Sequence, residues 1–75
     1  GFNLVNNHAI QCHYEHNQDS ETMKFVSQRH IPLIALSERS GLSVTDRGIT
    51  IVGFEPAYLF NETGKSEYSV GSQLA

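Results

Sequence analysis

The chain has 75 residues, a formal net charge of −3 and a single cysteine. This length allows one small domain with a limited core. An acidic chain whose five basic residues are scattered has no basic patch, so we expect neither nucleic acid nor an anionic membrane as a partner. One cysteine excludes an intrachain disulfide, and no apolar run approaches the ~20 residues that span a bilayer. We recognise no signal peptide and therefore expect a cytoplasmic protein.

Two short strands are expected at the start of the chain. Residues 2–5 predict a weak strand or loop, and an Asn-Asn pair follows as a turn. His8–Tyr14 alternates imperfectly between apolar and polar residues, which indicates a short buried strand. Neighbours on a strand face opposite sides, which argues against a Cys12–His13 nucleophile pair. Cys12 is instead expected in the core, where cysteine packs as a small apolar side chain.

A helix is expected after these strands. Asp19 or Ser20 is a good N-cap, and Glu21 places a negative charge in the first turn, where it suits the helix dipole. Apolar residues then recur at roughly helical spacing. Pro32 disfavours helical geometry in the residue before it, so the helix is expected to stop by Ile31.

The second half of the chain predicts strands. Leu33–Leu36 is continuously apolar, which is typical of a strand covered on both faces in a parallel sheet. Two hairpins are expected to follow. Residues 42–51 alternate about a turn at Gly48, which can take a positive φ, and residues 58–70 surround the polar segment Asn61–Lys65. The expected fold class is α/β, a βαβ unit followed by β-hairpins.

His13 and Glu38 are the candidate functional residues. Each comes at the end of one of the two predicted parallel strands, and parallel α/β sheets bind ligands beyond the carboxyl ends of their strands. A helical crossover makes the two strands plausible neighbours, so both side chains are expected at one edge of the sheet. A histidine and a glutamate held together can be the base and the orienting acid of a serine-hydrolase triad.

A zinc site is the rival interpretation of the histidines. Neutral imidazoles and a carboxylate are good zinc ligands, and His8, His13, Glu15 and His16 lie close in sequence. Their spacing fits no standard zinc motif, so we expect no metal and no other cofactor, and we interpret His8 and His16 as surface residues. Four aromatic side chains that could line a pocket are expected instead to pack in the core or the hairpins: Tyr14, Phe54, Tyr58 and Phe60.

Five segments occur in a characteristic order. They are a histidine before an aromatic residue, an apolar strand leading to a glutamate, a hairpin reaching a glycine, an aromatic strand and a Gly-led tail: His13-Tyr14, Ile34–Gly41, Leu42–Gly53, Ala57–Phe60 and Gly71-Ser72. In this succession the chain from Phe2 to Leu74 resembles the C-terminal part of the dipeptidase E and cyanophycinase group of serine peptidases.

The resemblance implies a flavodoxin-like α/β sandwich similar to the class I glutamine amidotransferases, with a Ser-His-Glu triad in chain order. It implies that His13 is the base and that Glu38 holds the imidazole. The family serine lies upstream within Gly-x-Ser-Ala-Gly, a motif that is not found here. We therefore expect residues 1–75 to be a C-terminal fragment of one peptidase domain. The partner is the N-terminal part with the nucleophile, and the substrate is a small peptide.

The missing serine also supports a non-catalytic interpretation. The alternative is a small α/β interaction module, or a family member that has lost activity. In either case the 75-residue chain alone is expected to hydrolyse nothing, and a homo-oligomer is considered because exposed strand edges pair with other chains. Arg39 stands where the family commonly has glycine, and it is expected either to pair with Glu38 or to point into solvent.

Overall fold

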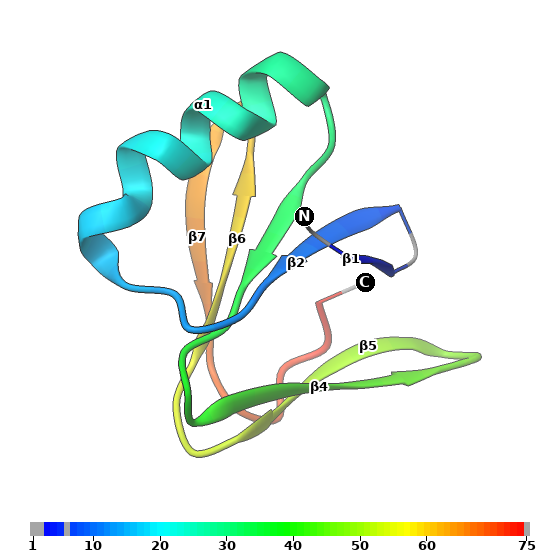
Figure 1. Cartoon of the computed structure of the whole chain (residues 1–75). Helices are drawn as coiled ribbons and strands as arrows, with labels where there is room; N and C mark the ends of the chain where they lie inside the picture. The colour runs from blue at the N-terminus through cyan, green and yellow to red at the C-terminus, as the bar shows by residue number, and fades with distance from the viewer. Residues whose placement is uncertain (1–2, 6, 75) are drawn as a thin grey trace.

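The structure is a computed structural model that describes residues 3–5 and 7–74. It has one α-helix, one short 3₁₀ helix and two sheets among these residues (Figure 1). The elements are, in chain order, β1 Asn3–Val5, β2 His8–Gln11, η1 His16–Gln18, α1 Asp19–Arg29, β3 Leu33–Ala35, β4 Ser40–Thr45, β5 Gly48–Gly53, β6 Ala57–Asn61 and β7 Gly64–Tyr68. The α/β class and the expected order of strand, helix, strand and two hairpins are confirmed. No helix in this part of the chain is long and apolar enough to cross a membrane.

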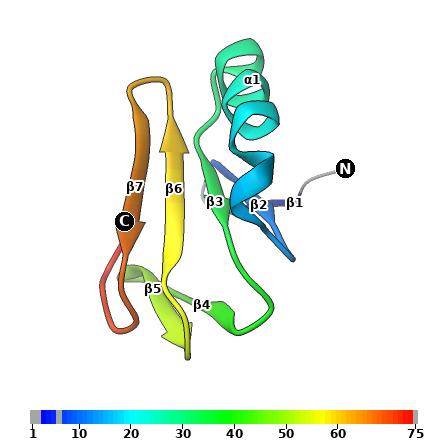
Figure 2. The same cartoon turned by 90° about the vertical axis from the view of Figure 1, so that its left-hand side faces the viewer.

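The main sheet has the strand order β1-β2-β3-β6-β7. β2 and β3 run parallel with Ala9 opposite Leu33, as the crossover through α1 requires. β6 then pairs antiparallel with β3 on its other side, so the sheet is mixed. Figure 2 shows β7, β6 and β3 side by side. The β4–β5 hairpin forms a separate two-stranded sheet.

β3 divides the core into two clusters because successive side chains of a strand face opposite sides. Leu33 and Ala35 pack with Val26 of α1, while Ile34 packs with Ile51 of the β4–β5 hairpin. The three β3 residues are fully buried. The prediction of a strand covered on both faces is therefore confirmed, with a helix over one face and a hairpin over the other.

The helix begins differently from the prediction. α1 starts at Asp19 with Gln18 as its N-cap, so the expected cap at Asp19 or Ser20 is wrong. The reason is that η1 leads directly into α1, and the Asp19 carboxylate binds Lys65 instead of the helix amides. The end of the helix agrees with the prediction, since His30 takes a left-handed conformation two residues before Pro32.

β2 is shorter than predicted and ends at Gln11. Cys12 and His13 lie in the bend that follows, and Cys12 is exposed, so its expected place in the core is wrong. The chain leaves the sheet here to reach α1, and the strand alternation on which the expectation rested no longer applies. The expected packing of Phe54 is also wrong: its side chain is 80% exposed, with the Arg39 guanidinium 5.2 Å from the ring centroid.

Both hairpins are confirmed. β4 and β5 are joined by two residues, and Gly48 has a φ of 126°, as the turn predicted. The turn between β6 and β7 is tighter than expected, with Asn61 opposite Gly64. The Asn61 side chain accepts hydrogen bonds from the amides of Thr63 and Gly64, and this closes the turn early.

Candidate functional site

His13 and Glu38 meet at the carboxyl edge of β2 and β3. His13 Nδ1 lies 3.6 Å from Glu38 Oε1, and the two side chains are 76% and 80% exposed. The expected proximity is therefore confirmed. The catalytic role of the two residues stays a prediction.

The backbone around His13 is tied to the strand that leads to Glu38. Leu36 donates its amide to the Gln11 carbonyl at 2.8 Å, and Tyr14 donates its amide to the Leu36 carbonyl at 2.9 Å. Between these bonds His13 has a φ of 57°, a left-handed conformation that is uncommon outside glycine. This conformation bends the chain at His13 while Gln11 and Tyr14, on either side of the bend, keep their bonds to Leu36, the residue that follows β3.

Glu38 lies in a tight turn held by serine side chains. The Ser40 amide donates to the Ser37 carbonyl at 3.2 Å, which closes the turn around Glu38. Ser37 Oγ donates to Glu55 Oε1 at 2.9 Å, and Ser40 Oγ shares its one proton between the carbonyls of Glu55 and Pro56, at 3.0 Å and 3.1 Å. The turn is therefore anchored to the segment that joins β5 to β6.

The same segment contacts the turn through its backbone. The Arg39 carbonyl accepts hydrogen bonds from the amides of Phe54 and Glu55, at 2.7 Å and 3.3 Å. Gly53 has a φ of 104°, and a Cβ there would lie only 2.5 Å from the Arg39 carbonyl oxygen. A glycine is thus required for the close approach of the β4–β5 hairpin to the Glu38 turn. Arg39 is exposed and its guanidinium lies over the Phe54 ring. Of the two expectations for Arg39, pairing with Glu38 or pointing into solvent, the structure agrees with the second.

A polar cluster supports the residue after His13. The Tyr14 ring is 5% exposed, and its hydroxyl donates to the Asp19 carboxylate. Lys65 Nζ lies 2.8 Å from Asp19 Oδ2 and 2.8 Å from His16 Nδ1. The Lys65 ammonium also lies 4.5 Å from the centroid of the Tyr58 ring. These contacts join η1, α1 and the β6–β7 hairpin around Tyr14.

The pKa shifts in this cluster indicate that Asp19 and Lys65 each stabilise the charged form of the other. Burial raises the pKa of Asp19, but hydrogen bonds from Lys65 and Tyr14 outweigh burial and hold that pKa below its ordinary value. Burial lowers the pKa of Lys65, but its bonds with Asp19 and Tyr14 outweigh this and raise it. The pKa of Tyr14 is raised by burial and by its bond to Asp19. Lys65 and Asp19 are therefore both charged at neutral pH.

A cavity of about 290 Å³ has walls that include sequence neighbours of the pair, since Tyr14 and Glu15 follow His13 and Ser37 precedes Glu38, but His13 and Glu38 themselves do not line it. It is lined by Tyr14, Glu15, His16, Ser37, Glu55, Pro56 and Tyr58. The sequence alone did not indicate Ser37 or Glu55 as functional residues. Glu55 is a single glutamate between Phe54 and Pro56, and no sequence pattern links it to Ser37.

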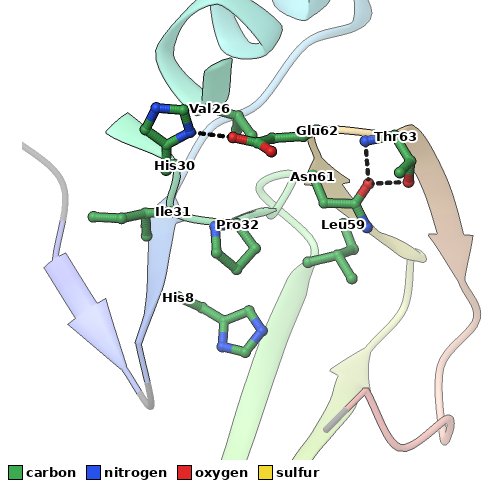
Figure 3. Close-up of a pocket in the computed structure, with 9 residues that line it drawn as sticks. All are labelled: His8, Val26, His30, Ile31, Pro32, Leu59, Asn61, Glu62 and Thr63. Atoms are coloured by element: carbon green, nitrogen blue, oxygen red, sulfur yellow. Dashed lines mark hydrogen bonds and ion pairs between the residues drawn. The ribbon is translucent and has the colours of Figure 1, made fainter. Parts of the chain in front are cut away.

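A larger cavity, of about 470 Å³, lies away from the pair, at the end of the sheet where β2 begins (Figure 3). Its apolar wall comes from Val26, Ile31, Pro32 and Leu59, and its polar residues are His8, His30, Asn61, Glu62 and Thr63. His30 Nδ1 contacts the Glu62 carboxylate at one end of the hollow, while His8 lies at the other end (Figure 3). This cavity therefore does not adjoin His13 or Glu38.

The rival zinc interpretation finds no support in the geometry. Within residues 3–5 and 7–74, no three side chains of His, Cys, Asp or Glu are grouped so that they could hold a metal ion. His8 begins β2 and lines the larger cavity, whereas His13 lies beyond the other end of that strand. His16 contacts Lys65 and the Tyr14 hydroxyl.

The fold defines the chain as a small α/β protein with a mixed sheet. No protein-family model matches the chain, and no significant match was found among curated proteins or solved structures.

Proposed function

We propose that this chain is the C-terminal part of a cytoplasmic serine peptidase of the dipeptidase E and cyanophycinase type, with a flavodoxin-like complete domain. His13 is its base and Glu38 its orienting acid. The observation that carries the proposal is the placement of the two side chains, 3.6 Å apart, at the carboxyl edge of two parallel strands. The motif order along the chain supports the choice of family.

The nitrogen that faces Glu38 is the one that a triad requires. His13 Nδ1 lies 3.6 Å from a Glu38 carboxylate oxygen, which in the proposed triad leaves Nε2 for the nucleophile. A serine from the upstream part attacks the peptide carbonyl carbon and passes its proton to Nε2, while Glu38 stabilises the imidazolium. Nε2 then gives the proton to the leaving amine. Water, activated by the same nitrogen, hydrolyses the acyl-serine and frees the acid.

The distance between the two side chains is consistent with a catalytic site that is completed by the upstream part of the protein. At 3.6 Å it must shorten by about 0.5 Å to become a hydrogen bond. Catalytic hydrogen bonds are often long without substrate and tighten in the reactive complex. His13 and Glu38 are exposed, which supports the proposal that the upstream part of the protein covers them. Such a cover would remove water and so strengthen the attraction between the imidazolium and the carboxylate.

The test uses the complete protein and small peptides, including isoaspartyl and cyanophycin-like ones. His13→Ala should lower kcat by about 10⁴-fold or more, and Glu38→Gln by a smaller factor. His8→Gln is the matched control, because His8 lies at the far end of β2 and lines the other cavity. Wild-type turnover in His13→Ala would refute the assignment.

One observation favours the alternative, a non-catalytic α/β interaction module or an inactive family member. Ser37 and Ser40 hydrogen bond to the segment after β5, and among the described residues no serine hydroxyl bonds to His13. Labelling the complete protein with a fluorophosphonate distinguishes the peptidase from the non-catalytic module. A label on an upstream serine that is lost in His13→Ala supports the peptidase, and an unlabelled protein supports the module.

A further inference from the structure

We propose that the 290 Å³ cavity is a subsite for a positively charged group of the substrate, an ammonium held by the carboxylates of Glu55 and Glu15. This inference rests on the proposed function for its role in catalysis. The binding itself does not depend on that function.

The walls of the cavity include chain neighbours of both functional residues. Tyr14 and Glu15 follow His13 directly and Ser37 precedes Glu38, although neither His13 nor Glu38 lines the cavity. The other lining residues include Glu55 and, from β6, Tyr58. In the proposed site the bound ammonium belongs to the same substrate whose peptide bond reacts at His13.

Glu55 is held in a fixed position. Its side chain is half-buried, and Oε1 accepts a hydrogen bond from Ser37 Oγ at 2.9 Å. The backbone beside it is also fixed, since the Glu55 carbonyl accepts from Ser40 Oγ at 3.0 Å and its amide donates to the Arg39 carbonyl at 3.3 Å. Among the described residues none donates a side-chain hydrogen bond to Glu55 Oε2, so this oxygen can accept from a ligand. A preorganised carboxylate of this kind binds an ammonium better than a mobile one.

The charge of the walls favours a cation. Two carboxylates line the cavity, and no lysine or arginine is among its lining residues. The nearest cation to consider is Lys65, which lies over the Tyr58 ring, but its charge is offset by Asp19 at 2.8 Å. His16, which also lines the cavity, is in contact with Lys65 and with the Tyr14 hydroxyl.

The size of the cavity limits the ligand to a small group. A volume of about 290 Å³ is at the lower limit of ligand pockets, which suits one residue rather than a long peptide. The ammonium has two sources in a peptide: the N-terminal amine and a lysine-like side chain. Both offer the same N–H donors to Glu55, so the experiment needs one probe for each.

The test measures binding to the complete protein by changes in the NMR signals of Ser37 and Tyr58. Glycinamide represents the N-terminal amine and n-butylammonium the side chain, while N-acetylglycinamide and 1-butanol are their uncharged counterparts. At least one ammonium probe should shift these signals, and the uncharged probes should not. The preferred probe identifies the source of the charge. Equal shifts with the uncharged probes would overturn the subsite.

Glu55→Gln keeps the shape of the side chain and an acceptor for Ser37 but removes the charge. It should weaken the binding of the ammonium probe by about tenfold. Glu62→Gln, in the other cavity, is the matched control and should bind as the wild type does. Unchanged affinity in Glu55→Gln would refute the role of Glu55. If this variant fails to fold, wild-type affinity that does not fall with added salt would refute it equally.

The outcomes separate this inference from the proposed function. His13→Ala should lose hydrolysis but keep ammonium binding, because His13 does not line the cavity. A protein that binds the ammonium and hydrolyses nothing refutes the peptidase and retains the cation site. A protein that hydrolyses peptides and binds neither ammonium probe retains the peptidase and refutes the subsite.

Discussion

A single methyl group at Gly53 should separate the Glu38 turn from the β4–β5 hairpin. Gly53 pairs with Ser40 at the end of the hairpin and has a φ of 104°. A Cβ at this position would lie 2.5 Å from the Arg39 carbonyl oxygen and 3.2 Å from the Ser40 Cα. Both neighbours are backbone atoms, so Gly53→Ala cannot be accommodated by a change of side-chain rotamer.

The cost of Gly53→Ala has two parts. The positive φ costs an alanine about 1–3 kcal/mol wherever it occurs. Relief of the clash requires the Arg39 carbonyl to move away, and this weakens the bonds from Phe54 at 2.7 Å and Glu55 at 3.3 Å. Each lost hydrogen bond costs about 1 kcal/mol. The expected total is about 3–5 kcal/mol, a large part of the stability of a small domain.

Comparison with Gly71→Ala isolates the cost of the clash with the Arg39 carbonyl, because Gly71→Ala carries only the cost of the positive φ. Gly71 also has a positive φ, 91°, but a Cβ there has no neighbour within 4 Å among the described residues. Denaturant unfolding of both variants should show Gly53→Ala to be less stable than Gly71→Ala by about 2 kcal/mol. Amide exchange at Phe54 should be faster in Gly53→Ala alone. Equal destabilisation by the two substitutions would refute the close-approach argument.

Two further predictions concern the cluster around Tyr14. The pKa of Asp19 is depressed in the folded state, so its contribution to stability is present above the ordinary aspartate value of about 4 and is lost as the pH falls through the folded pKa. Asp19→Asn should therefore flatten the acid limb of a plot of unfolding free energy against pH, and an unchanged limb would contradict the pairing with Lys65. Tyr14→Phe keeps the buried ring but loses the hydroxyl bond to Asp19, which should cost about 1 kcal/mol in denaturant unfolding. Tyr14→Ala also empties the site between Tyr58 and Phe60 and should cost about 3–5 kcal/mol, and similar losses for the two variants would show that ring packing contributes little.

The elements were largely predictable because their signals are local. The apolar run Leu33–Leu36 indicated a strand covered on both faces, and Gly48 indicated a tight hairpin turn. Pro32 predicted that the helix would stop by Ile31, and α1 ends at Arg29. The meeting of His13 and Glu38 was also predictable, because the carboxyl ends of parallel strands joined by a helix lie at one edge of the sheet.

Only the tertiary structure decided the surroundings of that pair. Ser37 reaches Glu55, and Asp19 reaches Lys65, across long stretches of chain that no local pattern connects. The exposure of Cys12 follows from where the chain leaves the sheet, which depends on how α1 packs rather than on the alternation of residues. Periodicity and turn residues determine elements one at a time. The placement of β6 beside β3, and with it the walls of the 290 Å³ cavity, is decided by the burial of side chains from distant segments in common cores.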